Sequence, residues 1–342
     1  MSDARSMSRR DALRISAGVG IGAAFGVGVG VELLRRAGLQ RVRETRAHMG
    51  TLVTLTVVHP ESGAARAMVD RAFAEMERLE AQLSRYRPDS AVGRLNKTGR
   101  LEAAPAALVD VLTLGLDVSR RSRGAFDVTI APLVELHTET FKRTGALPRD
   151  EDIERVLDHV GYHGLSVAGR QVELADPRMQ ISLDGVAKGF IVDRIVSRLS
   201  KDGAERVLVD AGGDMASGGV GVASDPWTVG VQHPRRTEAL VGRIQLQGGS
   251  IATSGDYLRH FTPDRRHHDI LDPRTGRSPV QASSATVIAP SAAEADALST
   301  ASLVLGSVDG IALIDAYHDA EALLVSKDNG RVTTRGMVER LG

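Results

Sequence analysis

The 342-residue sequence contains no cysteine, and this absence excludes several kinds of chemistry. The chain can form no disulfide, no thiolate nucleophile, no cysteine-ligated metal centre and no lipid-modified cysteine. Disulfides belong to oxidising compartments, but a chain bound for such a compartment can also do without thiols. The lack of cysteine is therefore compatible with export without demonstrating it.

Aromatic residues and net charge are also scarce. Phe, Trp and Tyr make up 3% of the chain, so the core must be built mainly from Val, Leu, Ile and Ala. Lys plus Arg and Asp plus Glu each number 43, which gives a formal net charge of zero and no electrostatic reason to expect nucleic acid as a partner. The hydrophobic fraction of 42% is still enough for a substantial core, in one large domain or two fused ones.

The first 34 residues are not typical of a folded domain. Arg9 and Arg10 precede an apolar, glycine-rich run from Ile15 to Leu34, which resembles a twin-arginine export signal. A membrane anchor is the alternative, because ~20 apolar residues can span a bilayer. The glycines weaken hydrophobicity and helix propensity, which favours the signal, although no small-x-small cleavage site stands out. We therefore expect a periplasmic protein, with residues 1–34 as a signal or a retained anchor.

The rest of the chain predicts an α+β architecture. Residues 35–47 are charged and are expected to form a linker, which leaves residues 48–342 as one large domain. Helices come between runs of strands rather than after each strand, which argues against a doubly wound sheet. Apolar periodicity predicts helices over 65–83, 105–121, 148–161, 186–199 and 292–305. Strands are expected over 51–58, 206–211, 227–232, 241–246 and 285–289, with a C-terminal hairpin at Asn329-Gly330.

A carboxylate and a hydroxyl stand four residues apart in the last of these helices. Asp296 and Thr300 would project from one helix face. Two oxygen ligands suit Mg²⁺, which usually takes one or two protein oxygens and leaves its other positions to water and phosphate. The alternative is structural: an Asp favoured near a helix start, and a Thr that bonds back to its own turn. Taken alone, the pair favours the structural interpretation.

Two loops carry further candidate chemistry. The Gly212-Gly213-Asp214 segment follows a Val-rich strand, and its amides could cradle a phosphate, although such a segment is more often only a bend. His267 and His268 lie in an arginine-rich loop, which is either a solvated turn or a place for a histidine base beside an anionic substrate. Zinc is a poor alternative there, because adjacent histidines rarely supply two tetrahedral ligands and no third is evident.

Short glycine-punctuated motifs follow one another in an order that resembles one family. They are Met-Gly-Thr from Met49, Ser-x-Tyr at Tyr86, Gly-Ala-Phe-Asp at Asp127, Ala-Lys-Gly at Lys188, Gly-Gly-Asp at Asp214, Ser-Gly-Asp-Tyr at Tyr257, Asp-Pro-Arg-Thr-Gly from Asp272 and Ala-Asp-Ala-Leu-Ser-Thr at Thr300. Each motif is weak alone. The ordered set, from about Met49 to Gly306, resembles the FAD:protein FMN transferases of the ApbE family.

The resemblance implies a fold, a reaction and a set of site residues. The fold would be T-fold-related, a single large domain of antiparallel sheets with packed helices. Members of the family cleave FAD and place its FMN portion on a Thr or Ser hydroxyl of an acceptor protein, forming a phosphoester and releasing AMP. By resemblance, Asp296 and Thr300 would hold Mg²⁺ together with a backbone carbonyl near Gly185. The residues that match flavin-nucleotide contacts are Met49, Tyr86, Ala125, Phe126, Asp127, Ser182, Lys188 and the backbone near Ile270.

The sequence departs from the family pattern at the expected base. The family commonly has a histidine three residues before the Asp-Pro pair, whereas this chain has Asp269 there and His268 one position earlier. An acceptor hydroxyl has a high pKa, so a base within reach assists its attack. We favour His268 as that base over Asp269.

Two other functions are compatible with the sequence. An FAD pyrophosphatase would use the same site with water in place of the acceptor hydroxyl. A noncatalytic flavin-binding protein would not need the Asp296–Thr300 pair. The leading hypothesis is an exported, Mg²⁺-dependent transferase that modifies a periplasmic or membrane electron-transfer protein, such as one that serves nitrous oxide respiration. The oligomeric state is not predicted.

Overall fold

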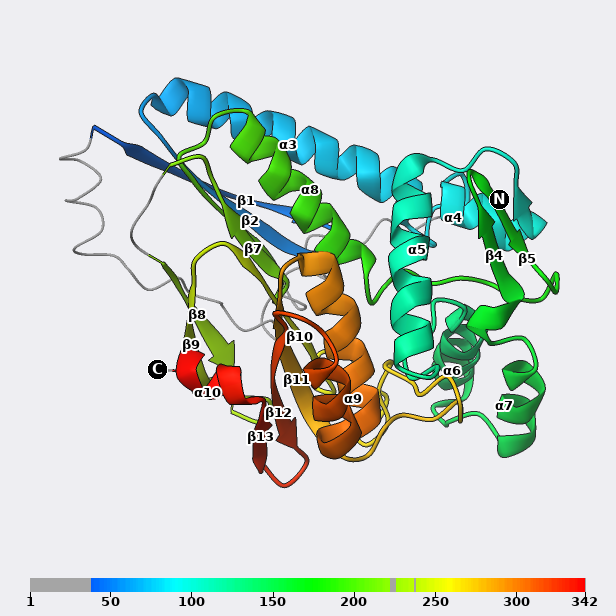
Figure 1. Ribbon diagram of the computed structural model, residues 1–342. Coiled ribbons are helices and arrows are strands. Elements are labelled where there is room, and N and C mark those ends of the chain that lie inside the picture. Colours follow the sequence, from blue (N-terminus) through cyan, green and yellow to red (C-terminus); the bar gives the residue numbers. More distant parts are fainter. Residues whose placement is uncertain (1–37, 222–225, 237, 342) are drawn as a thin grey trace.

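An eight-stranded antiparallel sheet forms the centre of the molecule (Figure 1). The computed structural model describes residues 38–221, 226–236 and 238–341, so the predicted signal or anchor over 1–34 lies outside the described residues. In spatial order the strands are β1 (Gln40–His48), β2 (Thr51–His59), β6 (Arg206–Ala211), β7 (Met215–Gly218), β10 (Gly249–Gly255), β11 (Ala282–Ala289), β12 (Glu321–Ser326) and β13 (Arg331–Thr333).

The sheet is buried on both faces. In β6, Val207 and Val209 belong to the main hydrophobic core, while Leu208 between them belongs to a second core on the opposite face. This alternation follows from the two-residue period of a strand. The second face is covered by the hairpin of β8 (Trp227–Gln232) and β9 (Leu240–Leu246), and by α10 (Arg335–Arg340).

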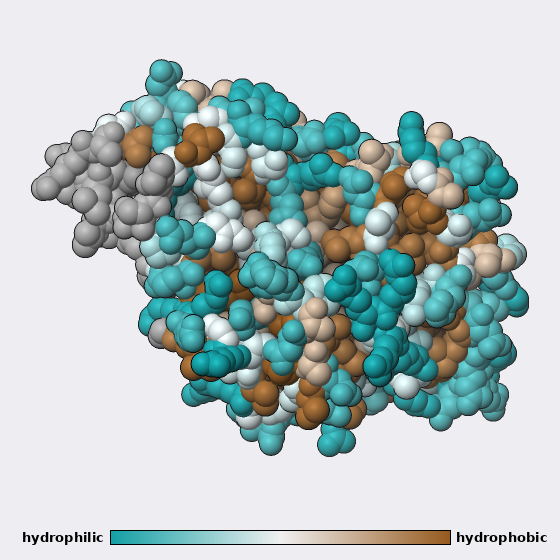
Figure 2. All heavy atoms as spheres, in the orientation of Figure 1, coloured by the Kyte–Doolittle hydropathy of each residue, from teal (hydrophilic) through white to brown (hydrophobic). Residues whose placement is uncertain are grey.

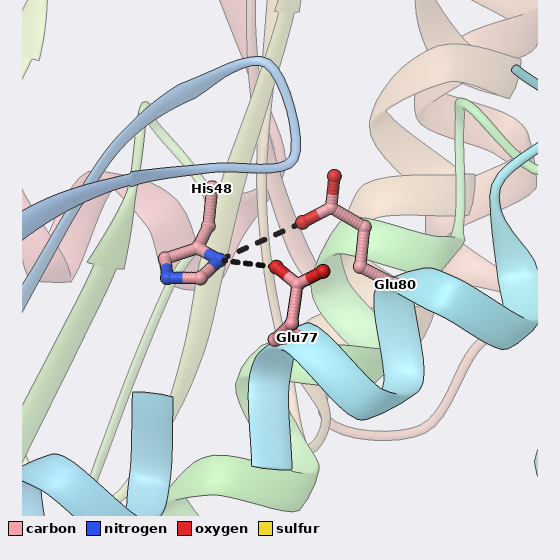
Figure 3. A group of neighbouring side chains, drawn as sticks. All are labelled: His48, Glu77 and Glu80. Carbon is pink, nitrogen blue, oxygen red and sulfur yellow. Dashed lines mark ion pairs between the residues drawn. The ribbon is translucent and has the colours of Figure 1, made fainter. Parts of the chain in front are cut away.

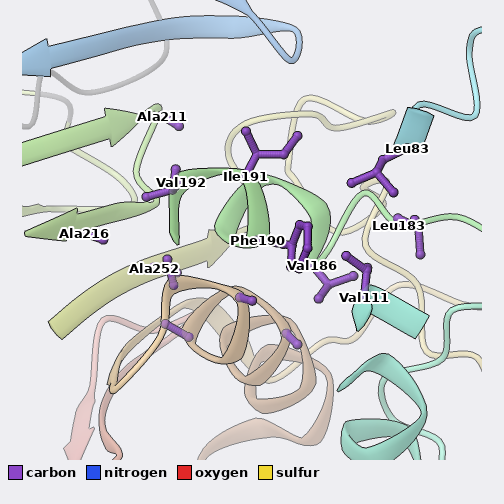
Figure 4. Packing of buried hydrophobic residues seen from close by; sticks show 14 of the residues in the cluster. Leu83, Val111, Leu183, Val186, Phe190, Ile191, Val192, Ala211, Ala216 and Ala252 are labelled. Atoms are coloured by element: carbon purple, nitrogen blue, oxygen red, sulfur yellow. The ribbon is translucent and has the colours of Figure 1, made fainter. Parts of the chain in front are cut away.

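Three long helices cover the main face: α3 (Ser62–Leu83), α8 (Ala187–Lys201) and α9 (Ala292–Asp315). Figure 4 shows α8 side chains such as Phe190 among buried residues from α3, the sheet and a neighbouring helix. Among the described helices, α9 alone is long and apolar enough to cross a membrane, yet it packs on β10, β11 and β12 as a core helix. Its apolar character is explained by that burial.

A smaller, mostly helical part packs beside α9. It comprises α4 (Ala91–Thr98), α5 (Ala106–Arg121), α6 (Ala131–Thr144), α7 (Asp150–Leu157), the short 3-10 helix η1 (Tyr162–Gly164) and a three-stranded sheet of β3 (Arg100–Leu101), β5 (Gln171–Leu174) and β4 (Leu165–Ala168). In this orientation, Figure 2 shows polar side chains over much of the surface, with apolar ones in patches between them.

The α+β prediction is confirmed, and each expected helix and strand is present, two strands with the predicted ends and the other elements with shifted ends. The linker expected over 35–47 is wrong for residues 40–47, which form most of β1 and pair with β2 along their whole length. The charged residues of this segment are those of an edge strand, where polar side chains protect an open edge from further pairing. Residues 42, 44, 46 and 48 are half-buried and alternate with exposed ones.

Candidate active site

The N-termini of α8 and α9 meet at the centre of the candidate site. A side chain on Gly189 would place its Cβ 2.1 Å from the Ala292 carbonyl oxygen, so the two helices touch backbone to backbone. Each helix also caps the other. Asp193 accepts hydrogen bonds from the first amides of α9, at 2.7 and 2.9 Å, and Asp296 accepts one from the Gly189 amide at 3.1 Å. These contacts satisfy donors that a helix start leaves open.

Asp296 is a buried carboxylate in need of positive charge. It is 3% exposed, and burial, together with the charge of Asp214, raises its pKa to about 8 against the opposing effect of Lys188. Lys188 pairs directly with Asp214. Burial lowers the pKa of Lys188, but the carboxylates of Asp214 and Asp296 outweigh burial and raise it above its ordinary value. One lysine thus faces two carboxylates and cannot neutralise both, so a further cation would be favourable here.

The three predicted metal ligands lie together. Thr300 is one turn beyond Asp296 on α9, and its Oγ1 lies 3.0 Å from the Ser254 hydroxyl. A Cβ on Gly185 would lie 3.2 Å from Thr300 Oγ1, so the backbone near Gly185 borders the same space. The available donors are oxygens, the ligands that Mg²⁺ prefers. The residues present therefore fit a magnesium ion.

A second group of side chains lines the outer part of the site. Asp184 accepts hydrogen bonds from Arg85 Nε at 2.9 Å and from the Tyr86 hydroxyl at 3.1 Å. Arg259 lies 4.0 Å from the carboxylate of Asp269. Burial raises the pKa of Asp269 to about 6, against the opposing effect of Arg259. This group joins two arginines with carboxylates close to Gly185, a charge pattern suited to a phosphorylated substrate.

His268 and Asp269 are separated by the fold. The Asp269 carboxylate faces Arg259, whereas the His268 ring is fully buried and lies under the electrostatic influence of Lys327. Burial, together with the positive charge of Lys327, lowers the pKa of His268 to about 4. The His268 backbone is fixed by Ser278, which accepts from its N–H and donates to its carbonyl. The structure thus places the carboxylate of Asp269, and not the ring of the favoured His268, beside Arg259 in the outer part of the site.

The remaining flavin candidates have different surroundings. Met49 lies in the turn between β1 and β2, and its neighbour Gly50 lies beside Arg259, since a Cβ on Gly50 would lie 3.8 Å from an Arg259 nitrogen. Ser182 accepts a hydrogen bond from the Asp184 amide at 3.2 Å and so shapes the loop before α8. Tyr86 is 63% exposed and available to a ligand. The backbone of Ile270 directly follows Asp269.

The Ala125-Phe126-Asp127 segment is buried and supports the site from behind. Phe126 packs against Gly185, because a Cβ there would lie 3.2 Å from its ring. Asp127 accepts hydrogen bonds from the Thr129 amide and hydroxyl and from the Tyr162 amide, at 2.7 to 2.8 Å. With its oxygens engaged, Asp127 holds its loop in place.

Sequence reasoning missed Arg85, Asp184 and Arg259. Arg85 and Asp184 lie inside or next to recognised motifs, so their position was the available signal, whereas Arg259 lies outside every motif.

The phosphate cradle considered for Gly212-Gly213 does not fit, because both amides donate to Asp210, at 3.1 and 3.4 Å. That segment is a bend that positions Asp214 to pair with Lys188.

Curated proteins with similar sequences carry the same name, FAD:protein FMN transferase. Two curated relatives, each an FAD:protein FMN transferase, are 32% identical to this chain. The protein from Salmonella typhimurium aligns over 270 residues, 76% of this chain and 77% of the relative. The protein from Treponema pallidum aligns over 332 residues, 89% of this chain and 90% of the relative.

Solved structures confirm the fold. The crystal structure of the ApbE protein from Thermotoga maritima matches with a TM-score of 0.81 at 28% identity, over 89% of this chain and all of that one. The flavinyl transferase ApbE from Pseudomonas stutzeri matches with a TM-score of 0.77 at 31% identity, over 89% of this chain and 98% of that one. The model of the ApbE family matches residues 49–324, and the chain belongs to that family.

Proposed function

We propose that this chain transfers the FMN portion of FAD to a Thr or Ser hydroxyl of an acceptor protein. The observation that carries the proposal is the Asp296–Thr300 pair, held beside Gly185 and Lys188 in a chain whose relatives are FAD:protein FMN transferases. The hydroxyl oxygen bonds to the FMN phosphorus, the pyrophosphate bond breaks, and AMP leaves with the bridging oxygen.

Mg²⁺ is the metal that we propose for the inner part of the site. Asp296, Thr300 and the backbone near Gly185 would hold it, and the raised pKa of Asp296 shows why this carboxylate favours a cation nearby. When bound, the ion would neutralise charge on the pyrophosphate. Lys188 lies within the same group and supplies a fixed positive charge.

Asp269 is the residue that we propose as the base. With a pKa of about 6 it is mainly ionised at neutral pH and can take the proton from the acceptor hydroxyl on one of its carboxylate oxygens. Arg259 and Arg85 stand beside it and would orient the negatively charged nucleotide. Tyr86, exposed at the rim, offers a ring face to the flavin or adenine.

The test is an incubation of the protein with FAD, Mg²⁺ and candidate acceptor flavoproteins. Transfer predicts a fluorescent acceptor on a denaturing gel and an FMN-sized mass gain on a Thr or Ser residue. Free AMP at the same rate with and without acceptor, and no covalent flavin, would instead indicate FAD hydrolysis. Flavin binding without either product would indicate a noncatalytic carrier.

Export by the twin-arginine route is a further part of the proposal. It is supported by Arg9-Arg10 ahead of a glycine-rich apolar run. The acceptor would then be a periplasmic or membrane electron-transfer flavoprotein, for example one that serves nitrous oxide respiration. A fusion of residues 1–47 to a reporter should be exported, and replacing both arginines with lysine should stop it. Export that persists in the lysine variant would refute this route.

A further inference from the structure

Three side chains of types that bind metals converge where β1 meets α3, at a place separate from the Asp296 site (Figure 3). The Nδ1 atom of His48 lies 3.6 Å from Glu77 Oε2 and 3.6 Å from Glu80 Oε2. One ligand atom from each of His48, Glu77 and Glu80 lies within 4.8 Å of the other two, and no other such group of His and carboxylate side chains is found in the described part of the chain. A single ion could therefore contact all three.

Local sequence explains the convergence. Met49 and Gly50 have φ values of 52° and 71° and form the two-residue turn between β1 and β2. A turn with two positive φ values matches the twist of a hairpin. It leaves His48 as the last residue of β1, against α3. Glu77 and Glu80 are three residues apart in α3 and therefore share the helix face that His48 meets.

Each of the three side chains is also held by a contact outside the group. The His48 ring stacks on Phe73, with ring centroids 5.4 Å apart and an interplanar angle of 17°. Arg87 donates to Glu77 Oε1 at 2.7 Å, and the backbone N–H after His48 donates to Glu80 Oε2 at 3.0 Å. Outer contacts of this kind orient the ligands of metal sites. The group is thus preorganised.

The distances from His48 to the two carboxylates are consistent with a metal site. A separation of 3.6 Å is longer than an N–H···O hydrogen bond. It is close to the spacing of about 3.4 Å between neighbouring ligands of a tetrahedral zinc ion with bonds of ~2.1 Å. Imidazole combined with carboxylate suits zinc and other transition metals, whereas Mg²⁺ prefers oxygen alone.

We propose that His48, Glu77 and Glu80 bind one zinc ion, with water as the fourth ligand. The ion joins the end of β1 to the C-terminal part of α3 and so fixes the turn of Met49 and Gly50, next to Arg259 of the active site. Its role is to clamp the β1–β2 hairpin onto the helix, and it takes no part in the transfer chemistry.

The test measures zinc binding by the full chain after removal of metals with a chelator. Excess Mg²⁺ is present, and an Asp296→Asn version is run in parallel so that the inner site cannot account for the signal. We expect one zinc per chain, and a loss of affinity of more than about a hundredfold in the His48→Gln variant. Glu77→Gln should show a similar loss, and because Glu77 is half exposed this variant should fold normally.

His59→Gln is the matched control, because His59 ends the partner strand β2 and contacts Glu61 instead of a carboxylate pair. Zinc should raise the Tm of the parent and of this control, but not of the His48 variant. Equal zinc binding by the His48 and His59 variants would overturn the proposal. So would the absence of micromolar zinc binding by the parent.

Discussion

The inner and outer walls of the active site are built in different ways. The inner wall, formed by the starts of α8 and α9, is buried, and its residues also cap and join the two helices. The outer wall, formed by Tyr86, Asp184, Arg259 and Asp269, comes from loops and reaches the surface. Changes to the inner wall should therefore disturb both stability and activity, and changes to the outer wall should disturb activity alone.

The largest effect is expected from Gly189→Ala in the inner wall. The added Cβ would lie within 2.1 to 2.7 Å of backbone atoms at the start of α9, and backbone cannot move aside as a side chain can. We expect a loss of about 3 kcal/mol in the free energy of unfolding, with activity lost as well. Urea denaturation measures the free energy of unfolding, and the acceptor gel measures the transfer activity.

Gly63→Ala is the control for that substitution. Gly63 lies in the first turn of α3, and no atom lies within 4 Å of the position that an added Cβ would take, so alanine should be neutral or should stabilise by up to about 1 kcal/mol. If both variants had the same free energy of unfolding, the close contact between α8 and α9 would not explain why position 189 needs glycine.

Asp296→Asn should abolish transfer while leaving the protein folded. The carboxylate has a folded pKa near 8, far above its unfolded value, so between about pH 4 and pH 8 the folded state holds a proton that the unfolded state has lost. Without Mg²⁺, stability should therefore fall as pH rises through this range, and the asparagine variant should show a flatter dependence. Thermal denaturation across pH measures this, and an identical pH dependence in parent and variant would contradict it.

Asp269→Asn tests the outer wall. We expect turnover to fall by about 10² to 10⁴ with FAD binding and Tm unchanged, because the base is lost but the fold is not. In the parent, turnover should rise with pH through about 6, as Asp269 ionises. His268→Gln should keep that profile, since the ring is buried and has a pKa of about 4. Loss of the pH 6 limb in the His268 variant alone would restore His268 as the base.

The smallest effect is expected from Tyr86→Phe. The change removes the hydrogen bond that the hydroxyl donates to Asp184 and the one that it accepts from Arg85, and it keeps the ring. Because the position is exposed and water can replace these bonds, we expect a net loss of about 0.5 to 1.5 kcal/mol, so the KM for FAD should rise by roughly 2- to 10-fold with kcat unchanged. Steady-state kinetics decides, and a large fall in kcat would mean that the hydroxyl takes part in the reaction.

The buried wall was easier to predict from the sequence than the exposed one. Asp296 and Thr300 are four residues apart on one helix, and helical periodicity alone places them on one face. Asp184 and Arg259 are 75 residues apart and come from different loops, so no local pattern could relate them. The choice between His268 and Asp269 depends on tertiary structure for a similar reason, because a one-residue step decides which side chain lies beside Arg259.

The sequence by itself determined the α+β class, most helices and strands and the family to which the chain belongs, since these depend on periodicity and on ordered motifs. Only the tertiary structure decided that residues 40–47 are an edge strand, that Asp269 rather than His268 faces Arg259, and that His48 meets Glu77 and Glu80. The physical reason is that solvent-exposed strands and loops are placed by long-range packing, which local residue preferences do not encode.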